Sequence, residues 1–173
     1  MSTWILLRGL ARERRHWHAF PELLRAALEP NDEVIPLELP GNGVLRDVRS
    51  PLSIAENVDI LRERLHENGR SAPYNLLAIS MGGMVAVDWM HRYPGEVERA
   101  VIVNSSLRGL SPIHHRLRPE HFDKLWRAIM GGEAVADRER LVLEMTTRMR
   151  EDLDELAKKN AEISVDMPTE RGN

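Results

Sequence analysis

The sequence contains no cysteine and little excess charge of either sign. The absence of cysteine excludes disulfides, thiolate metal sites and a cysteine nucleophile. It also fits a reducing compartment, so we expect a cytoplasmic protein. With 24 Lys and Arg against 27 Asp and Glu, the net charge is −3. That balance argues against non-specific binding to nucleic acid, which needs a strongly basic face.

Long apolar runs are also missing. The longest early run, Trp4 to Leu7, ends at Arg8. A secretory signal needs about 7–15 apolar residues and a membrane span needs about 20. The sequence therefore predicts neither a leader nor a contact with a membrane. A chain of 173 residues is nevertheless long enough to bury a sizeable core.

Short apolar runs alternate with helix-like segments over residues 1–106. This alternation is typical of an α/β fold, in which a mainly parallel sheet carries helices on both faces. On the segment that Gly82-Gly83 opens, Met84, Val87 and Met90 recur about one turn apart. The predicted strands are 4–7, 34–37, 74–79 and 100–103, and the predicted helices are 20–28, 53–68 and 82–92.

Local signals support several of these boundaries. Pro36 lies inside a predicted strand, where it is tolerated only if its missing N–H is not needed for pairing. Ser53 and Glu56 have the spacing of a capping box at a helix start. Asn68-Gly69 is a typical helix end.

The pattern changes after residue 106, where no further strand is evident. We expect helices at 119–130, 138–150 and 153–163, and a mobile polar tail at 164–173. The chain is therefore expected to comprise a core at 1–106, a helical cap at 107–163 and the tail.

The most informative string runs from Leu76 to Gly83, where a buried strand leads into Ser80 and two glycines open the next helix. A nucleophile elbow needs this arrangement, because its serine occupies a sharp turn between strand and helix. Small residues must stand two positions before and after that serine, and these are Ala78 and Gly82. The N–H of Met81, at the helix start, could then stabilise an oxyanion.

Residues 1–106 resemble the α/β-hydrolase family, specifically its small esterase and thioesterase-like members. The matching segments are 4–10, 38–43, 78–83 and 93–104. The resemblance implies a serine hydrolase that acts on a small ester or thioester through an acyl-enzyme at Ser80. Backbone N–H groups of Met81 and Leu10 would form its oxyanion hole, and it would need no metal or organic cofactor.

The sequence departs from the family pattern in four ways. Arg8 replaces a histidine, Ala78 replaces a glycine and Glu38 replaces an aspartate. The fourth departure is larger, since the family order is serine, acid, then histidine, and no histidine follows His121. Three versions of the hydrolase interpretation remain open. The chain could be a shortened product of a longer enzyme, an enzyme that uses a cap histidine, or an inactive relative. The alternative from another class is a binding module without catalysis.

Other side chains carry weaker hypotheses. His114 or His115 could act as a substitute base, although a solvated pair is the more ordinary interpretation. His16 and His18 could lie at the border of the site. A cluster of arginines could bind an anionic group of the substrate, namely Arg8, Arg12, Arg14 and Arg15. Three aromatic residues could line a pocket for the acyl group: Trp17, Phe122 and Trp126. Strand 100–103 is expected to form an exposed sheet edge, which would favour self-association.

Overall fold

The computed structural model describes residues 1–107, 110, 119, 122–130, 134–147 and 151–165. The chain forms two compact units, Met1–Leu107 and Arg108–Asn173. The first unit holds a sheet with the strand order β2-β1-β3-β4, and every neighbouring pair is parallel. Its strands are β1 Thr3–Leu7, β2 Glu33–Leu37, β3 Tyr74–Ile79 and β4 Val97–Val103.

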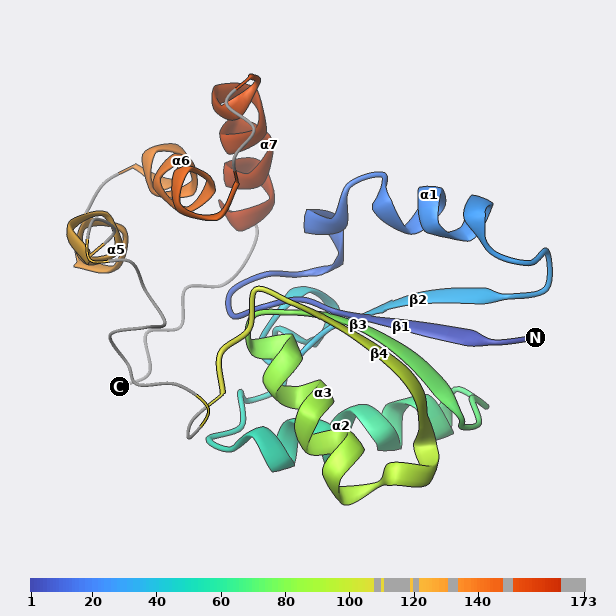
Figure 1. The fold of residues 1–173 in the computed structure, drawn as a ribbon. Helices are drawn as coiled ribbons and strands as arrows, with labels where there is room; N and C mark the ends of the chain where they lie inside the picture. The colour runs from blue at the N-terminus through green and yellow to red at the C-terminus, as the bar shows by residue number, and fades with distance from the viewer. Residues whose placement is uncertain (108–109, 111–118, 120–121, 131–133, 148–150, 166–173) are drawn as a thin grey trace. The chain divides into compact units, whose positions relative to one another are not determined.

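Helices cover both faces of this sheet, which confirms the α/β prediction. Helices α2 and α3 lie on one face and α1 lies on the other (Figure 1). Three short 3₁₀ helices lie in the connections. The helices are α1 Phe20–Ala27, α2 Ile54–Glu67, α3 Met81–Arg92, η1 Arg14–Trp17, η2 Gly43–Leu45 and η3 Pro94–Glu96.

The predicted boundary signals lie at the ends of elements, although only the Ser53 half of the capping box is formed. Pro36 lies on β2, an outer strand that pairs only with β1 in the described sheet, so its missing N–H costs no central hydrogen bond. The Ser53 hydroxyl caps α2 by accepting a hydrogen bond from the Glu56 N–H at 3.2 Å. Helix α2 ends at Glu67, Asn68 caps it, and Gly69 follows with φ +69°.

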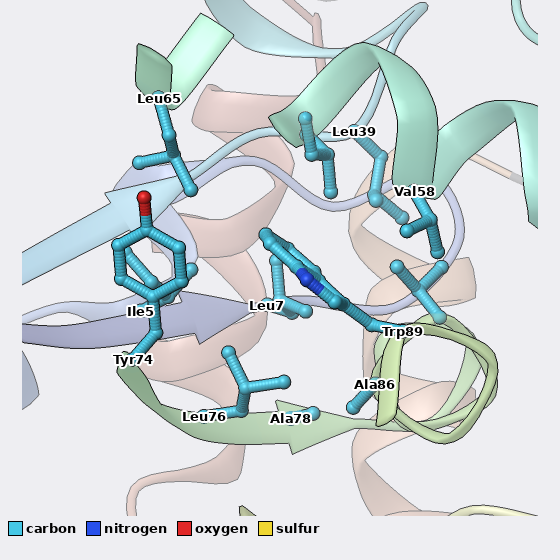
Figure 2. Packing of buried hydrophobic residues seen from close by; sticks show 12 residues of the cluster. Ile5, Leu7, Leu39, Val58, Leu65, Tyr74, Leu76, Ala78, Ala86 and Trp89 are labelled. Atoms are coloured by element: carbon cyan, nitrogen blue, oxygen red, sulfur yellow. The ribbon is translucent and has the colours of Figure 1, made fainter. Parts of the chain in front are cut away.

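The main core lies between the sheet and helices α2 and α3, and we call this side the α2/α3 face. Trp89 of α3 is fully buried there, with its ring edge toward Tyr74 at a centroid distance of 5.9 Å (Figure 2). Alternate strand residues point into this core because successive side chains leave a strand on opposite faces. The cluster comprises Ile5, Leu7, Leu39, Val58, Leu61, Leu65, Tyr74, Leu76, Ala78, Val85, Ala86 and Trp89.

The opposite side, which we call the α1 face, has a smaller core. Leu6, Trp17 and Val34 are buried there. Trp4, Leu24, Leu28, Leu77 and Ile79 pack around them and are only partly buried. One helix of eight residues covers this face, whereas helices of 14 and 12 residues cover the other.

One boundary of the sequence prediction was wrong. The strand predicted at 100–103 begins at Val97 and has seven residues, because the charged Glu98 and Arg99 near its start interrupt the apolar run. On α3, the buried side carries Val85, Ala86 and Trp89, whereas Met84, Val87 and Met90 are half-buried.

Strand β4 is the other outer strand of the described sheet. Its side chains Val101, Ile102 and Val103 are 44%, 39% and 44% exposed. The apolar edge expected from the sequence is therefore present, and the strand that carries it begins three residues earlier than predicted.

The second unit contains helices α5 Phe122–Met130, α6 Val135–Thr146 and α7 Leu153–Val165. Its described core includes Leu141, Ala157 and Ala161, and ion pairs join Lys124 to Glu144 at 2.7 Å and Arg140 to Asp154 at 3.1 Å. Helix α6 begins and ends three or four residues before the predicted segment 138–150. Most of the predicted tail, residues 166–173, lies outside the described residues.

The described residues lack two further features. None of the described helices combines the length and the apolar character that crossing a membrane requires. Nor do the described His, Asp and Glu side chains form a group of three or more that could hold a metal ion.

Candidate active site

Ser80 joins β3 to α3 and has an unusual backbone conformation. Its dihedral angles are φ 56° and ψ −119°, which a residue with a side chain rarely adopts, and the residue is exposed. A conformation of this kind costs about 1–3 kcal/mol and persists only where surrounding contacts enforce it. The sharp turn predicted at this serine is therefore present.

Hydrogen bonds from the end of β4 hold this turn. The Ser80 N–H donates to the Val103 carbonyl at 3.1 Å, and the Ser105 hydroxyl donates to the Ser80 carbonyl at 2.8 Å. The Gly83 N–H also donates to the Ser80 carbonyl, at 2.9 Å. Sequence reasoning missed the part played by Ser105, because only the pairing of β3 with β4 brings it to Ser80.

Both glycines at the start of α3 are required by close packing. A Cβ on Gly82 would lie 2.5 Å from the Leu7 carbonyl oxygen and 2.7 Å from the Arg8 carbonyl oxygen. Backbone atoms cannot move away from a new Cβ in the way that the end of a flexible side chain can. A Cβ on Gly83 would collide with the Ser105 hydroxyl. Ala78, two residues before Ser80, is fully buried, in accord with the small residue that the elbow needs there.

The loop after β1 lies against the serine. A Cβ on Gly9 would be 3.0 Å from the Ser80 Cβ and 3.3 Å from its Oγ. Leu10 follows Gly9, and its side chain is exposed. Met81 is the first residue of α3, where the helix supplies no acceptor for its N–H. The structure thus brings the loop that contains Leu10 to the same corner as Ser80 and Met81.

Glu38 has a structural role in the turn that follows β2. Its buried carboxylate accepts hydrogen bonds from the Val44 N–H at 2.5 Å and the Arg14 N–H at 3.2 Å. A side chain on Gly43, which has φ +50°, would collide with this carboxylate. Glu38 therefore joins the 38–45 turn to the loop that carries η1.

His16 and Trp17 of η1 are both buried, at 4% and 6% exposure. The Nδ1 atom of His16 accepts a hydrogen bond from the Glu13 N–H at 3.2 Å. Burial lowers the pKa of His16 to about 3, and the nearby positive charges of Arg12 and Arg8 contribute. His16 is therefore a neutral imidazole at physiological pH, which the sequence alone did not indicate.

The other histidines do not complete a catalytic pair within the described structure. His91 is exposed on α3, as expected. His114, His115 and His121 lie outside the described residues. Among the residues that are described, no histidine is hydrogen-bonded to the Ser80 hydroxyl. In the second unit Phe122 and Trp126 are 51% and 66% exposed.

Comparisons with known proteins agree with this geometry. The model of the "Alpha/beta hydrolase family" matches residues 4–168. Among curated proteins, the chain is similar to the biotin biosynthesis bifunctional protein BioHC of Teredinibacter turnerae, with 27% identity over 133 residues. That match covers 70% of this chain and 22% of the relative.

Solved structures give the same fold. A variant of the meta-cleavage product hydrolase CumD from Pseudomonas fluorescens IP01 superposes with a TM-score of 0.68 at 21% identity, over 95% of this chain and 57% of that protein. A carboxylesterase structure from Nitrososphaera gargenis gives a TM-score of 0.66 at 17% identity, over 96% and 65% of the two chains. The chain thus spans less than two thirds of each of these relatives. The family model covers most of the sequence, and the chain belongs to the alpha/beta hydrolase family.

Proposed function

We propose that the chain is a serine hydrolase of small carboxylic esters or thioesters, with Ser80 as the nucleophile. The observation that carries this proposal is the conformation of Ser80, an exposed serine held at φ 56° between β3 and α3. Strain of this kind is concentrated at functional sites. It presents the hydroxyl at the carboxyl end of a parallel sheet, where α/β proteins bind ligands.

The proposed reaction begins with attack of the Ser80 Oγ on the carbonyl carbon of the ester. The N–H groups of Met81 and Leu10 would donate to the resulting oxyanion, and the start of α3 adds a partial positive charge. Expulsion of the alcohol or thiol leaves an acyl-enzyme, which water then hydrolyses. A general base must accept the Ser80 proton, and the candidates within the sequence are the cap histidines His114 and His115.

A serine-directed fluorophosphonate tests the nucleophile directly. We expect rapid labelling of the folded protein and no labelling of Ser80→Ala. Ser71→Ala is the matched control, because Ser71 is also exposed and lies at the opposite end of β3. Labelling that persists in Ser80→Ala would refute the assignment.

One observation favours a second candidate, a binding module that keeps the fold without the chemistry. Within the described residues, the Ser80 hydroxyl has no histidine as a hydrogen-bond partner. Folded protein that is not labelled by the fluorophosphonate would support this candidate. Slow hydrolysis alone would not decide, because a site without its base retains about 10³–10⁴-fold catalysis over water.

We also propose that the outer edge of β4 pairs with a second copy of the chain. The edge offers backbone groups along seven residues, and three of its apolar side chains are more than one third exposed. An exposed strand edge is a template for another strand, and a second copy presents an identical one.

A further inference from the structure

The side chain of Ser105 is bonded to the backbone of the proposed nucleophile. Strand β4 ends at Val103, which pairs with Ile79 of β3. Asn104 then takes φ 53°, a left-handed conformation that asparagine adopts more readily than most residues. The Ser105 hydroxyl that follows donates a hydrogen bond to the Ser80 carbonyl at 2.8 Å. It also lies 3.3 Å from the Val103 carbonyl oxygen, so the shorter bond to Ser80 is the stronger of the two.

The Ser80 carbonyl and the Met81 N–H belong to one peptide unit. Such a unit is planar and trans, so its C=O and its N–H point in opposite directions. Two hydrogen bonds hold the carbonyl, one from Ser105 Oγ at 2.8 Å and one from the Gly83 N–H at 2.9 Å. Because a carbonyl oxygen has two lone pairs, both are then engaged. The direction of this carbonyl sets the direction of the Met81 N–H, the proposed oxyanion donor.

The bond from Ser105 holds this peptide unit in a way that the bond from Gly83 does not. Gly83 belongs to α3, so its N–H fixes the Ser80 carbonyl only relative to the helix that follows. Ser105 follows β4, and the Val103 carbonyl of β4 accepts the Ser80 N–H at 3.1 Å. The peptide units on both sides of Ser80 are thereby joined to the neighbouring strand.

Close packing keeps the Ser105 side chain against the start of α3. Ser105 is half-buried. A Cβ on Gly83 would collide with Ser105 Oγ, and it would lie 2.7 Å from Ser105 Cβ and 2.8 Å from Cγ2 of Ile102. The absence of a side chain at Gly83 therefore makes room for the Ser105 hydroxyl beside the Ser80 carbonyl.

We propose that Ser105 is a positioning residue, which aims the Met81 N–H at the oxyanion without touching the substrate. This inference rests on the proposed function, because the oxyanion forms only if Ser80 attacks an ester. A hydrogen bond to the carbonyl also polarises the peptide unit and makes its N–H a stronger donor. The oxyanion exists only after attack begins, so Ser105 acts on kcat rather than on KM.

Steady-state hydrolysis of p-nitrophenyl acetate tests this role. Loss of a whole oxyanion donor costs about 10²–10³ in kcat. Ser105→Ala loosens a donor without removing it, so we expect kcat to fall by about tenfold and KM to stay the same. Ser106→Ala is the matched control, because it removes an equally half-buried hydroxyl one residue further along and should leave kcat unchanged.

Three kinetic results would overturn the positioning role. The first is an unchanged kcat in Ser105→Ala. The second is a rise in KM in place of the loss of kcat, which would indicate contact with the substrate. The third is an equal loss in Ser106→Ala. Circular dichroism of each variant verifies that it is folded.

Nuclear magnetic resonance tests the hydrogen bond without any hydrolysis. An HNCO spectrum joins the Ser80 carbonyl carbon to the Met81 N–H in one peak, and a carbonyl carbon moves upfield when it loses a hydrogen bond. We expect this peak to move in Ser105→Ala and to stay in place in Ser106→Ala. A peak that does not move in Ser105→Ala would overturn the inference.

Fluorophosphonate labelling of the unchanged protein keeps the two proposals apart, because it depends on the nucleophile. A labelled Ser80 whose HNCO peak is unaffected by Ser105→Ala would refute the role of Ser105 and leave the proposed function intact. An unlabelled Ser80 in folded protein would refute the proposed function and, with it, any role for Ser105 in catalysis.

Discussion

The two faces of the sheet both receive apolar side chains but bury them to different extents. On the α2/α3 face, two long helices bury a cluster of twelve residues around Trp89 (Figure 2). On the α1 face, one short helix covers three buried residues, and most of the surrounding apolar side chains stay partly exposed. Apolar packing is therefore concentrated on the α2/α3 face. On the α1 face, the buried His16 Nε2 and Trp17 Nε1 atoms have no hydrogen-bond partner among the described residues.

Replacing Trp89 should produce the largest effect on stability. Its side chain is fully buried on the α2/α3 face, so Trp89→Ala should lower the free energy of unfolding by about 3–5 kcal/mol. Trp4→Ala on the α1 face should cost clearly less, since Trp4 is only half-buried. Urea denaturation followed by circular dichroism measures both values. Equal costs would remove the contrast between the faces.

Gly82→Ala should have the next largest effect. The new Cβ would collide with the carbonyl oxygens of Leu7 and Arg8, and overpacking of this kind typically costs about 1–3 kcal/mol. We also expect weaker fluorophosphonate labelling, because the turn at Ser80 would shift. Gly95→Ala is the control, since nothing lies within 4 Å of a Cβ there. Normal labelling of a fully stable Gly82→Ala would contradict the close packing.

The buried imidazole of His16 should make stability depend on pH. Its pKa is about 3 in the folded chain and about 6.5 in the unfolded chain. Below pH 6.5 the unfolded state therefore binds one proton more, and stability falls as the pH falls. Between pH 6.5 and 5 the loss should be about 1.5 kcal/mol. It should disappear in His16→Gln and persist in His91→Gln, which alters an exposed ring. An unchanged slope in His16→Gln would show that this imidazole is not held neutral.

The smallest effect concerns association through β4. Light scattering should show a mass that rises above the monomer with concentration. Val101→Lys should reduce that rise, because a lysine on an edge strand opposes pairing. Val165→Lys adds the same charge at an exposed position of α7 and should have no effect. A monomer at high concentration in the unchanged protein would refute this mode of association.

The sequence predicted most of the first unit because its signals are local. Alternating apolar runs and the turn at Ser80 depend on residues close together in the chain. The buried side of α3 could not be predicted from the sequence, since Met84, Val87 and Met90 are as apolar as the residues that pack. Which of these two sets of residues is buried depends on the strands beneath the helix.

The site was predicted less completely for a similar reason. Ser80, Met81 and Leu10 could be named from one motif and one resemblance, and their roles stay predictions. Ser105 reaches Ser80 only through the pairing of β3 with β4. The neutral state of His16 depends on burial and on Arg8 and Arg12 together. A lone His-Trp pair in a basic loop gives no sign of that environment.

Trapping the acyl-enzyme is the most direct test of the central claim, that Ser80 is the nucleophile. The protein would be mixed with p-nitrophenyl acetate, quenched in acid and digested, and the peptides analysed by mass spectrometry. We expect one acetyl group on the peptide that contains Ser80, and none on that peptide in Ser80→Ala. A folded protein that acquires no acetyl group, or acquires it only at other residues, would exclude Ser80 as the nucleophile.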